Sequence, residues 1–379
     1  MFHMLPSGGG IRVLKQFAEG LVKRDRKVCV FVPHGGSLLG ITEETAIPYP
    51  MWRRPSGFLR PVSPVFLPLR LLAFKSVCRE AARLMDHEGG IALVHNAMPV
   101  AAPPVLQYLA VPSVYFCYEY PRHIYEKDII SRTGGKLQEC LLKPLERLEQ
   151  RIDNESAIAA DRILTFSKHM GTMIQNTYGK EPGIVRPGVD SEFFTPSCTG
   201  EKGGYVLSVG ALWPFKGHET AIRIVAEIPM ESRPSLIIIG DREFPSYSRM
   251  LQRTAEAADV KMTVRRNITD FELRELYRGA SAVLCCQRKE PYGLVPLEAM
   301  ACGTPVVAIA EGGFTDNVID GSTGLLFDGS VNQGASELAK ALNNDRTIRE
   351  ITAAAHDFVK HSRTIEQGVA TLLEELDSV

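Results

Sequence analysis

The chain has 379 residues, of which 45% are hydrophobic and 23% charged, as in ordinary globular proteins. At about 150 residues per domain, this length predicts two domains. The net charge of -1 argues against nucleic acid as a partner. Residues 1–200 nevertheless carry 24 basic and 19 acidic side chains, so the acidic excess lies in the rest of the chain. This composition excludes coiled-coil, collagen-like and disordered classes.

The eight cysteines show no C-x-x-C spacing, so they predict neither a disulfide framework nor a zinc site. We therefore expect a reducing, cytoplasmic location and no bound metal. The longest uncharged stretch, residues 89–118, contains four prolines, which rules against a transmembrane helix there. No basic segment precedes an apolar run at the N-terminus, so no secretion signal is expected.

Short β-branched runs alternate with amphipathic segments along the whole chain. In the first half, strands are expected at residues 28–32, 91–95, 113–118 and 162–167. After a turn-rich segment, further strands are expected at residues 205–209, 235–239, 261–264, 282–286 and 304–309. This alternation is typical of α/β domains built on parallel sheets. We expect one such domain over residues 1–195 and a second over 205–363, with a linker between them.

Ligands of parallel sheets bind where the loops after the strands converge. The first such loop, Ser7-Gly8-Gly9-Gly10, precedes a helix expected from residue 11 to about residue 23. Glycines let the backbone approach a ligand, and the NH groups of a helix start attract an anion. A glycine turn of this kind also has an ordinary structural use, so the loop alone leaves both interpretations open.

The loop after the strand at 205–209 ends in Lys216, just before a helix expected to begin near His218. A lysine at that place adds its charge to the helix-end dipole, and the combination suits a diphosphate. The alternative is a solvated lysine beside a turn.

The loop after the strand at 282–286 is the most informative. Its helix is expected to begin near Leu294, which places Glu290 in the loop and Glu298 about one turn into the helix. Carboxylates accept hydrogen bonds from sugar and ribose hydroxyls, and the NH groups at the helix start suit a phosphate. These NH groups belong to Gly293, Leu294 and Val295. Taken singly, each glutamate could be a helix cap or a surface residue, but their order and flanking strands favour a site.

Three further segments follow expected strands. Residues 311–316, Glu-Gly-Gly-Phe-Thr-Asp, could add NH donors to the same pocket, although a Gly-Gly turn before a helix is common. In the first half of the chain, His95 follows one strand, and Tyr118 and Arg122 follow the next. These three side chains are candidates for a pocket on the first domain. A single histidine after a strand is more often structural than catalytic.

These residues resemble glycosyltransferase family 4. The resemblance runs from Gly8 to the Gly-Ser-Thr-Gly-Leu-Leu-Phe segment at 321–327, and its most specific part is the Glu290-x7-Glu298 pattern followed by Ala-Met-Ala-Cys-Gly-Thr-Pro-Val-Val. It implies an α/β GT-B fold, with two Rossmann-like domains whose parallel sheets face each other across an interdomain cleft. The nucleotide would lie mostly on the C-terminal domain and the acceptor on the N-terminal one. A last helix at about 364–377 would cross back to the first domain.

The resemblance also implies roles for single residues. Glu298 would bind the ribose, Glu290 the donor sugar and Lys216 the diphosphate, which makes Glu290 and Lys216 the catalytic candidates. The backbone of Gly9 and Gly10 would approach the phosphate or the sugar. His95, Tyr118 and Arg122 would face the acceptor. No metal or other cofactor is required, consistent with the absence of a D-x-D motif. Retention of configuration would follow from a front-face attack in which the leaving diphosphate helps to deprotonate the acceptor.

Three positions depart from the family pattern. Ala211 stands where an arginine often accompanies the lysine, so Arg186 or another group would have to supply that charge, or the donor binds less tightly. Tyr118 replaces a frequent histidine, which puts a catalytic role at this position in doubt. Asp316 stands for a usual glutamate. A nucleotide-sugar-binding protein without turnover and a GT-B epimerase or hydrolase therefore stay open as alternatives.

The segment from residue 46 to residue 79 contains six basic side chains and no acidic one, interspersed with large apolar residues. It predicts peripheral contact of the first domain with an anionic membrane, or else a proline-punctuated loop and a core helix. The sequence as a whole predicts transfer of a hexose, with mannose among the compatible sugars, from a nucleotide-diphosphate sugar. The acceptor would be a glycan or a lipid-linked glycan of polysaccharide, lipopolysaccharide or glycoconjugate biosynthesis.

Overall fold

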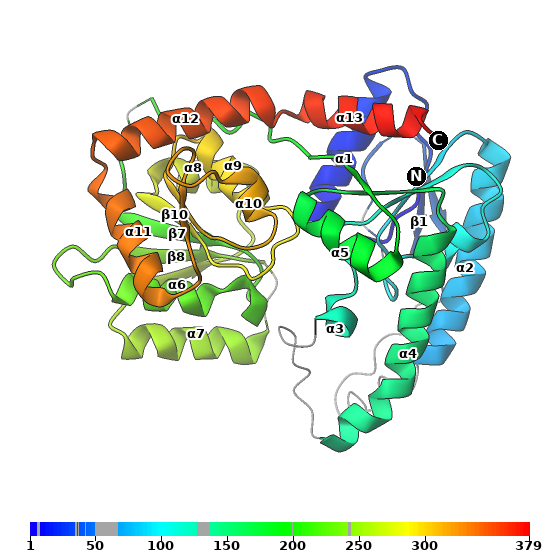
Figure 1. The fold of residues 1–379 in the computed structure, drawn as a ribbon, viewed down its shortest axis with the longest axis horizontal. Helices are drawn as coiled ribbons and strands as arrows, with labels where there is room; N and C mark the ends of the chain where they lie inside the picture. Colours follow the sequence, from blue (N-terminus) through cyan, green and yellow to red (C-terminus); the bar gives the residue numbers. More distant parts are fainter. Residues whose placement is uncertain are drawn as a thin grey trace. The chain divides into compact units, whose positions relative to one another are not determined.

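The computed structural model describes residues 1–5, 8–34, 36, 38–41, 43–49, 67–126, 136–198, 200–241 and 244–379. The chain divides into two compact units, each with its own sheet and helices (Figure 1). The first unit comprises Met1–Arg186 together with Gly368–Val379, and the second comprises Pro187–Gln367.

The first unit is built on parallel strands flanked by helices. Its elements are α1 (Gly9–Val22), β1 (Val30–Pro33), β2 (Glu44–Ile47), α2 (Leu67–Glu88), β3 (Ala92–His95), η2 (Pro104–Gln107), β4 (Ser113–Phe116), α3 (Arg122–Tyr125), α4 (Lys136–Ala159), β5 (Arg162–Thr165), α5 (Lys168–Tyr178) and β6 (Gly183–Ile184). Strands β3, β4, β5 and β6 lie side by side in that order, and β1 pairs with β2.

The first residues of the chain join these two groups of strands. Phe2 forms parallel bridges with Phe31 of β1 and with Val94 of β3. The backbone bonds confirm the position, because Phe31 N donates to Met1 O at 2.8 Å and His95 N donates to Phe2 O at 2.8 Å. The N-terminal residues therefore lie between β1 and β3. On one side of them the chain adds β1 and then β2, and on the other side it adds β3 to β6.

The second unit contains the longer continuous sheet. Its elements are β7 (Tyr205–Val209), η3 (Pro214–Lys216), α6 (His218–Ala226), β8 (Ser235–Ile239), α7 (Pro245–Ala257), β9 (Met262–Arg265), α8 (Asp270–Gly279), β10 (Ala282–Cys285), α9 (Leu294–Ala301), β11 (Val306–Ile309), α10 (Phe314–Asn317), β12 (Leu325–Phe327), α11 (Val331–Asn343) and α12 (Arg346–Ser362). All six strands are parallel, in the order β12-β11-β10-β7-β8-β9. The order reverses between β7 and β10, and such a switch point is where open α/β sheets bind ligands.

Local sequence explains where the helices begin and end. Thr269 and Glu272 form a complete capping box at the start of α8. Ser167 caps α5 through a bond from Met170 N, and Gly179 ends this helix with a left-handed φ of 69°. The strands β3, β4, β10 and β11 are buried along their whole length, as expected for parallel strands with helices on both faces.

The last helix, α13 (Ile365–Asp377), contributes its residues from Gly368 onward to the first unit. There Val369 packs so closely on Gly20 of α1 that a side chain at position 20 would collide with it. Glu375 pairs with Arg162 of β5 at 2.9 Å. These contacts give the first unit a covering helix from the far end of the chain.

All nine strands expected from the sequence are present, with ends that differ by up to two residues. The sequence did not indicate β2, β6 or β12, which are short and lie at sheet edges. The division between the units falls at residues 186 and 187, before the turn-rich segment at 195–204. The reason is that residues 187–195 bind the second unit: Tyr292 donates to Pro187 O at 2.7 Å, and Arg278 donates to Thr195 O at 2.6 Å.

Candidate functional site

The candidate site lies at the switch point of the second sheet, in the loops that follow β7 and β10. These two strands are direct neighbours, so their loops leave the sheet side by side. The loop after β7 closes through Gly217, whose φ is +72°. Any side chain at position 217 would collide with the carbonyl of Cys286, the first residue after β10, so the two loops are in direct contact. The topology thus brings together two segments that are some 75 residues apart.

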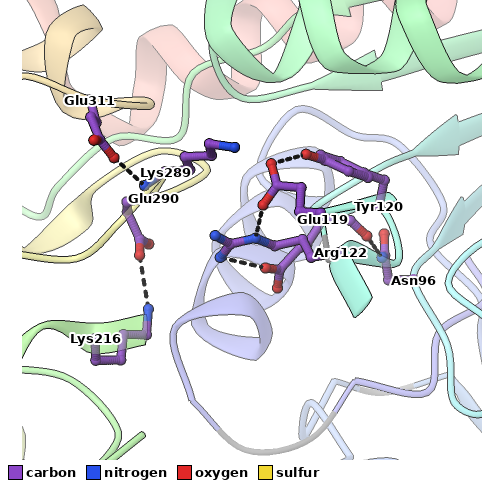
Figure 2. A network of polar contacts seen from close by, with 9 residues as sticks. Asn96, Glu119, Tyr120, Arg122, Lys216, Lys289, Glu290 and Glu311 are labelled. Carbon is purple, nitrogen blue, oxygen red and sulfur yellow. Dashed lines mark hydrogen bonds and ion pairs between the residues drawn. The ribbon is translucent and has the colours of Figure 1, made fainter. Parts of the chain in front are cut away.

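Lys216 and Glu290, predicted from separate loops, form an ion pair here (Figure 2). The distance from Lys216 Nζ to Glu290 Oε2 is 2.8 Å, and the two side chains are 22% and 20% exposed. An ammonium has three hydrogens and a carboxylate has about four lone pairs, so one bond leaves both groups able to bind a ligand. The pair therefore offers a cation for phosphate and an acceptor for a hydroxyl at one place.

Glu298 lies on α9, which begins at Leu294 as predicted. Its side chain is only 3% exposed, and its Oε2 accepts a hydrogen bond of 2.8 Å from the hydroxyl of Tyr277. Tyr277 is itself fully buried on α8. A buried carboxylate is costly unless it is hydrogen-bonded, so Tyr277 stabilises and orients Glu298. The sequence analysis did not identify this tyrosine, and a tyrosine on an amphipathic helix gives no signal of such a role.

The start of α9 is shaped by Gly293. This residue has a φ of +91°, and a side chain there would come within 2.6 Å of the Phe314 ring. The next two residues, Leu294 and Val295, are half-buried. The first NH groups of a helix have no carbonyl partner within the helix and favour an anion. The predicted phosphate donors are thus presented by a turn that only glycine accommodates.

His218, which the sequence analysis did not assign to the site, fixes the backbone of the loop after β7. The ring is fully buried, with Nδ1 at 3.0 Å from Ser208 Oγ and Nε2 at 3.1 Å from Gly210 O. Because a carbonyl can only accept, Nε2 carries the proton and Nδ1 accepts from the serine. Burial lowers the pKa of His218 to about 4, so the ring is neutral. It holds Gly210 and Ala211 in place.

The segment at 311–316 bonds to the loop that carries Glu290. Gly313 N donates to Glu290 O at 2.6 Å, and the NH groups of Thr315 and Asp316 bond to carbonyls of their own turn. These three NH groups are therefore engaged inside the protein, and a contribution of the segment's other NH groups to a ligand stays a prediction. The segment supports the backbone of Glu290.

In the first unit, the glycine loop and the expected acceptor-side residues meet beside an aromatic cluster. Gly9 and Gly10 begin α1, and a side chain at position 10 would lie 3.3 Å from the Tyr118 ring. His95 is fully buried and stacks on Phe116, while Tyr118 is 7% exposed and stacks on Phe166. Burial lowers the pKa of His95 well below its usual value, so this ring is neutral as well. The structure thus places both side chains in the core.

Arg122 is also buried, with 5% exposure. Its Nε donates to Glu126 Oε2 at 2.8 Å, and its Nη1 lies 3.3 Å from Glu119 Oε1. Tyr120 donates to the other oxygen of Glu126. Two carboxylates thus compensate the guanidinium, as a buried arginine requires.

The remaining expectations concern metals, membranes and the basic segment. Within the described ranges, no group of three or more His, Cys, Asp or Glu side chains could hold a metal ion. In the same part of the chain, no helix has both the length and the apolarity needed to cross a bilayer. Ser7, Arg53, Arg54 and Arg60 lie outside the described residues.

Comparisons with known proteins agree with this architecture. The family model "Glycosyltransferase Family 4" matches residues 7–193, and "Glycosyl transferases group 1" matches residues 191–358. The chain is 36% identical to a D-inositol 3-phosphate glycosyltransferase from Acidothermus cellulolyticus, over 45% of this chain and 43% of that protein. It is 33% identical to one from Kribbella flavida, over 54% and 53%. The chain thus spans about half the length of these curated relatives.

Solved structures show the same fold at low sequence identity. Sucrose-phosphate synthase from Thermosynechococcus elongatus superposes with a TM-score of 0.76 at 17% identity, over 98% of this chain and 94% of that one. HepE from Anabaena, in complex with UDP and glucose, superposes with a TM-score of 0.72 at 18% identity, over 100% and 99%. The predicted GT-B fold is confirmed. Because the two family models together account for residues 7–358, the chain belongs to the family 4 (group 1) glycosyltransferases.

Proposed function

We propose that this protein transfers a sugar from a nucleotide-diphosphate sugar to an acceptor hydroxyl, with the donor held by the second unit. The observation that carries the proposal is the 2.8 Å pair of Lys216 and Glu290 at the sheet's switch point, followed by Glu298 one turn into α9. Family membership and the UDP-glucose complex of HepE support a donor of this class.

Each group at the switch point suits one part of such a donor. Lys216 and the NH groups at the start of α9 supply positive charge to the diphosphate, and this charge grows in importance as the leaving group departs. Glu290 accepts a hydroxyl of the transferred sugar. Glu298, oriented by its bond from Tyr277, accepts a hydroxyl of the ribose. The protein thereby stabilises the departing diphosphate through its own cations and dipoles.

We propose retention of configuration, as the family resemblance implies. The acceptor hydroxyl attacks from the side that the diphosphate leaves, and its proton passes to a diphosphate oxygen as the bond to the sugar forms. Lys216 stays bonded to the diphosphate throughout. No enzymic nucleophile is then needed.

The acceptor class is a glycan, a lipid-linked glycan or, in view of the relatives' names, a phosphorylated cyclitol. Peripheral contact with an anionic membrane stays a prediction. On the described part of the basic segment, Leu69 and Leu72 of α2 are 49% and 64% exposed, beside Arg70 and Lys75. Such exposed apolar side chains with neighbouring cations suit a lipid surface.

A panel of UDP-, GDP- and ADP-sugars tests the function. Thermal shift should identify the nucleotide, since a ligand that binds only the folded state raises the melting temperature. Nucleotide release that requires an acceptor would support transfer. Release or sugar conversion without any acceptor would indicate a hydrolase or an epimerase, and binding without turnover would indicate a non-catalytic homologue. Either result would contradict the proposal.

A further inference from the structure

An ion pair between Arg288 and Glu311 connects the loop that carries Glu290 to the loop after β11. Arg288 Nε lies 2.8 Å from Glu311 Oε2, and Arg288 Nη2 lies 2.8 Å from Glu311 Oε1, which is a two-pronged arrangement. The side chains are 54% and 27% exposed. An ordinary surface pair contributes about 0 to 1 kcal/mol to stability. Any stronger consequence of this pair must therefore come from what it holds in place.

Arg288 and Glu311 join three loops at the site. Arg288 N donates to Phe215 O at 3.1 Å, directly beside Lys216 in the loop after β7. Glu311 follows β11 and precedes the glycine turn whose Gly313 N bonds to Glu290 O. The pair thus connects the neighbours of both proposed catalytic residues.

The residue between Arg288 and Glu290 has an unusual backbone. Lys289 has a φ of +46°, a left-handed conformation that costs a residue other than glycine roughly 1 to 2 kcal/mol. Its NH donates to Glu311 Oε2 at 3.4 Å, and Figure 2 shows this bond beside the pair of Glu290 and Lys216. Such a conformation persists only where the surroundings fix it. Glu311 supplies that constraint immediately before Glu290.

The glycine turn makes the contact rigid. A side chain at Gly312 would come within 2.6 Å of the backbone N and O of Glu290, so the two loops touch without intervening atoms. A shift of the segment that contains Glu311 would therefore move Glu290 as well.

We propose that Glu311, with Arg288 as its partner, is a positioning residue that holds Lys289 in its left-handed conformation and thereby aims Glu290 at Lys216. This inference rests on the proposed function, because Glu290 is given its role there. Glu311 itself does not touch the donor. Its effect passes through the backbone of residues 288–290.

The kinetic test compares Glu311→Gln with Glu350→Gln. Glu350 pairs with Arg346 at 2.7 Å on the exposed face of α12, so its variant also removes one exposed ion pair and serves as the matched control. Glu311→Gln should lower kcat about tenfold and change the donor KM less than twofold, because the geometry of catalysis suffers more than binding. Glu350→Gln should leave both unchanged. Equal kinetics of Glu311→Gln and the wild type would overturn the proposal.

Two second-site variants separate positioning from a general loss of structure. Lys289→Gly in the Glu311→Gln background should restore part of kcat, because glycine adopts the left-handed conformation at no steric cost. Exchanging the charges, with Arg288→Glu and Glu311→Arg together, re-forms the ion pair but should not restore kcat, because a guanidinium cannot accept the bond from Lys289 N. Recovery by the charge exchange, or no recovery by Lys289→Gly, would show that the pair does not act through Lys289.

Hydrogen exchange measured without substrate makes the test independent of the reaction. In Glu311→Gln, the amides of Arg288, Lys289 and Glu290 should exchange faster than in the wild type, and in Glu350→Gln they should not. If the wild type shows no turnover with any nucleotide sugar, the proposed function fails while the exchange result still decides whether Glu311 holds this loop. Unchanged exchange in Glu311→Gln would overturn the positioning role.

Discussion

The loops that follow the strands carry different kinds of side chain in the two units, although the strand order reverses in both units. In the second unit, Lys216 and Glu290 are about one-fifth exposed and pair with each other. In the first unit, His95 is fully buried in an aromatic cluster and Arg122 is enclosed by carboxylates. Residues after strands were candidates in both units by the same rule. The difference teaches that position after a strand identifies the loop, whereas the partners that the fold places around a side chain decide how that side chain is used.

The sharpest way to break this comparison is to remove the carboxylate of Glu290. Glu290→Gln should lower kcat by about 10² to 10³, the usual cost of losing one group that stabilises a transition state, with little change in donor affinity. Arg122→Lys in the first unit is the counterpart. It should change stability more than kcat, because Arg122 is buried between its two glutamates. Steady-state kinetics and urea unfolding measure both, and a larger kcat loss in Arg122→Lys would reverse our assignment.

Glu298 should respond differently from Glu290. Glu298→Gln should raise the donor KM while kcat changes little, because its contact to the ribose is made before and during transfer alike. Tyr277→Phe should raise the donor KM about tenfold, since it removes a hydrogen bond to a buried carboxylate, a loss of about 1 to 3 kcal/mol. A fall in kcat alone for either variant would contradict the division of roles.

Much of this site could be predicted because its determinants are local. The start of α9 at Leu294 follows from Gly293 before it, and the buried strands follow from their β-branched runs. The contact of Tyr277 with Glu298 and the pair of Arg288 with Glu311 join residues more than 20 positions apart. Such contacts depend on which strands are neighbours and on how their helices pack. A local sequence pattern contains no information on either.

The same reason explains where the surroundings of single residues differ from those expected. The burial of His95 and Tyr118 is caused by Phe116 and Phe166, which come from two other places in the sheet. The turn at Gly312 and Gly313 was expected to supply NH donors to a ligand, but the NH group of Gly313 bonds to Glu290 O within the protein. In both cases the residue type was noticed correctly and its surroundings were decided by topology.

Substitutions of one glycine in each unit should change the free energy of unfolding by different amounts. Gly217→Ala in the second unit should reduce the free energy of unfolding by about 3 kcal/mol, because the methyl group would collide with the Cys286 carbonyl at a left-handed backbone position. Gly8→Ala in the first unit, at a φ of +136° with no atom within 4 Å, should cost only about 1 kcal/mol of backbone strain. Urea unfolding of the two variants measures this. Equal losses would show that the loop after β7 is not tightly packed on β10.

The stability of the two units should also depend on pH in opposite directions. His218 has a folded pKa of about 4, so between pH 7 and pH 5 the unfolded chain takes up a proton that the folded chain refuses. Stability that His218 contributes at neutral pH is therefore lost as the pH falls, by about 2 kcal/mol over that interval. His218→Gln should remove this part of the acid sensitivity, as measured by urea unfolding at several pH values. An unchanged slope would mean that the folded ring takes up its proton over the same pH range as the unfolded chain.

Asp153 of α4 should act in the other direction. Burial raises its pKa to about 6, although it accepts bonds from Ala102 N at 2.8 Å and the Tyr178 hydroxyl at 2.7 Å. Between pH 5 and pH 7 the folded state thus binds a proton that the unfolded state has already released, so this group reduces stability by about 1 kcal/mol as the pH rises. Asp153→Asn should flatten that decline. If the variant instead lost stability equally at every pH, Asp153 would be ionised in the fold, and its two hydrogen bonds would outweigh its burial.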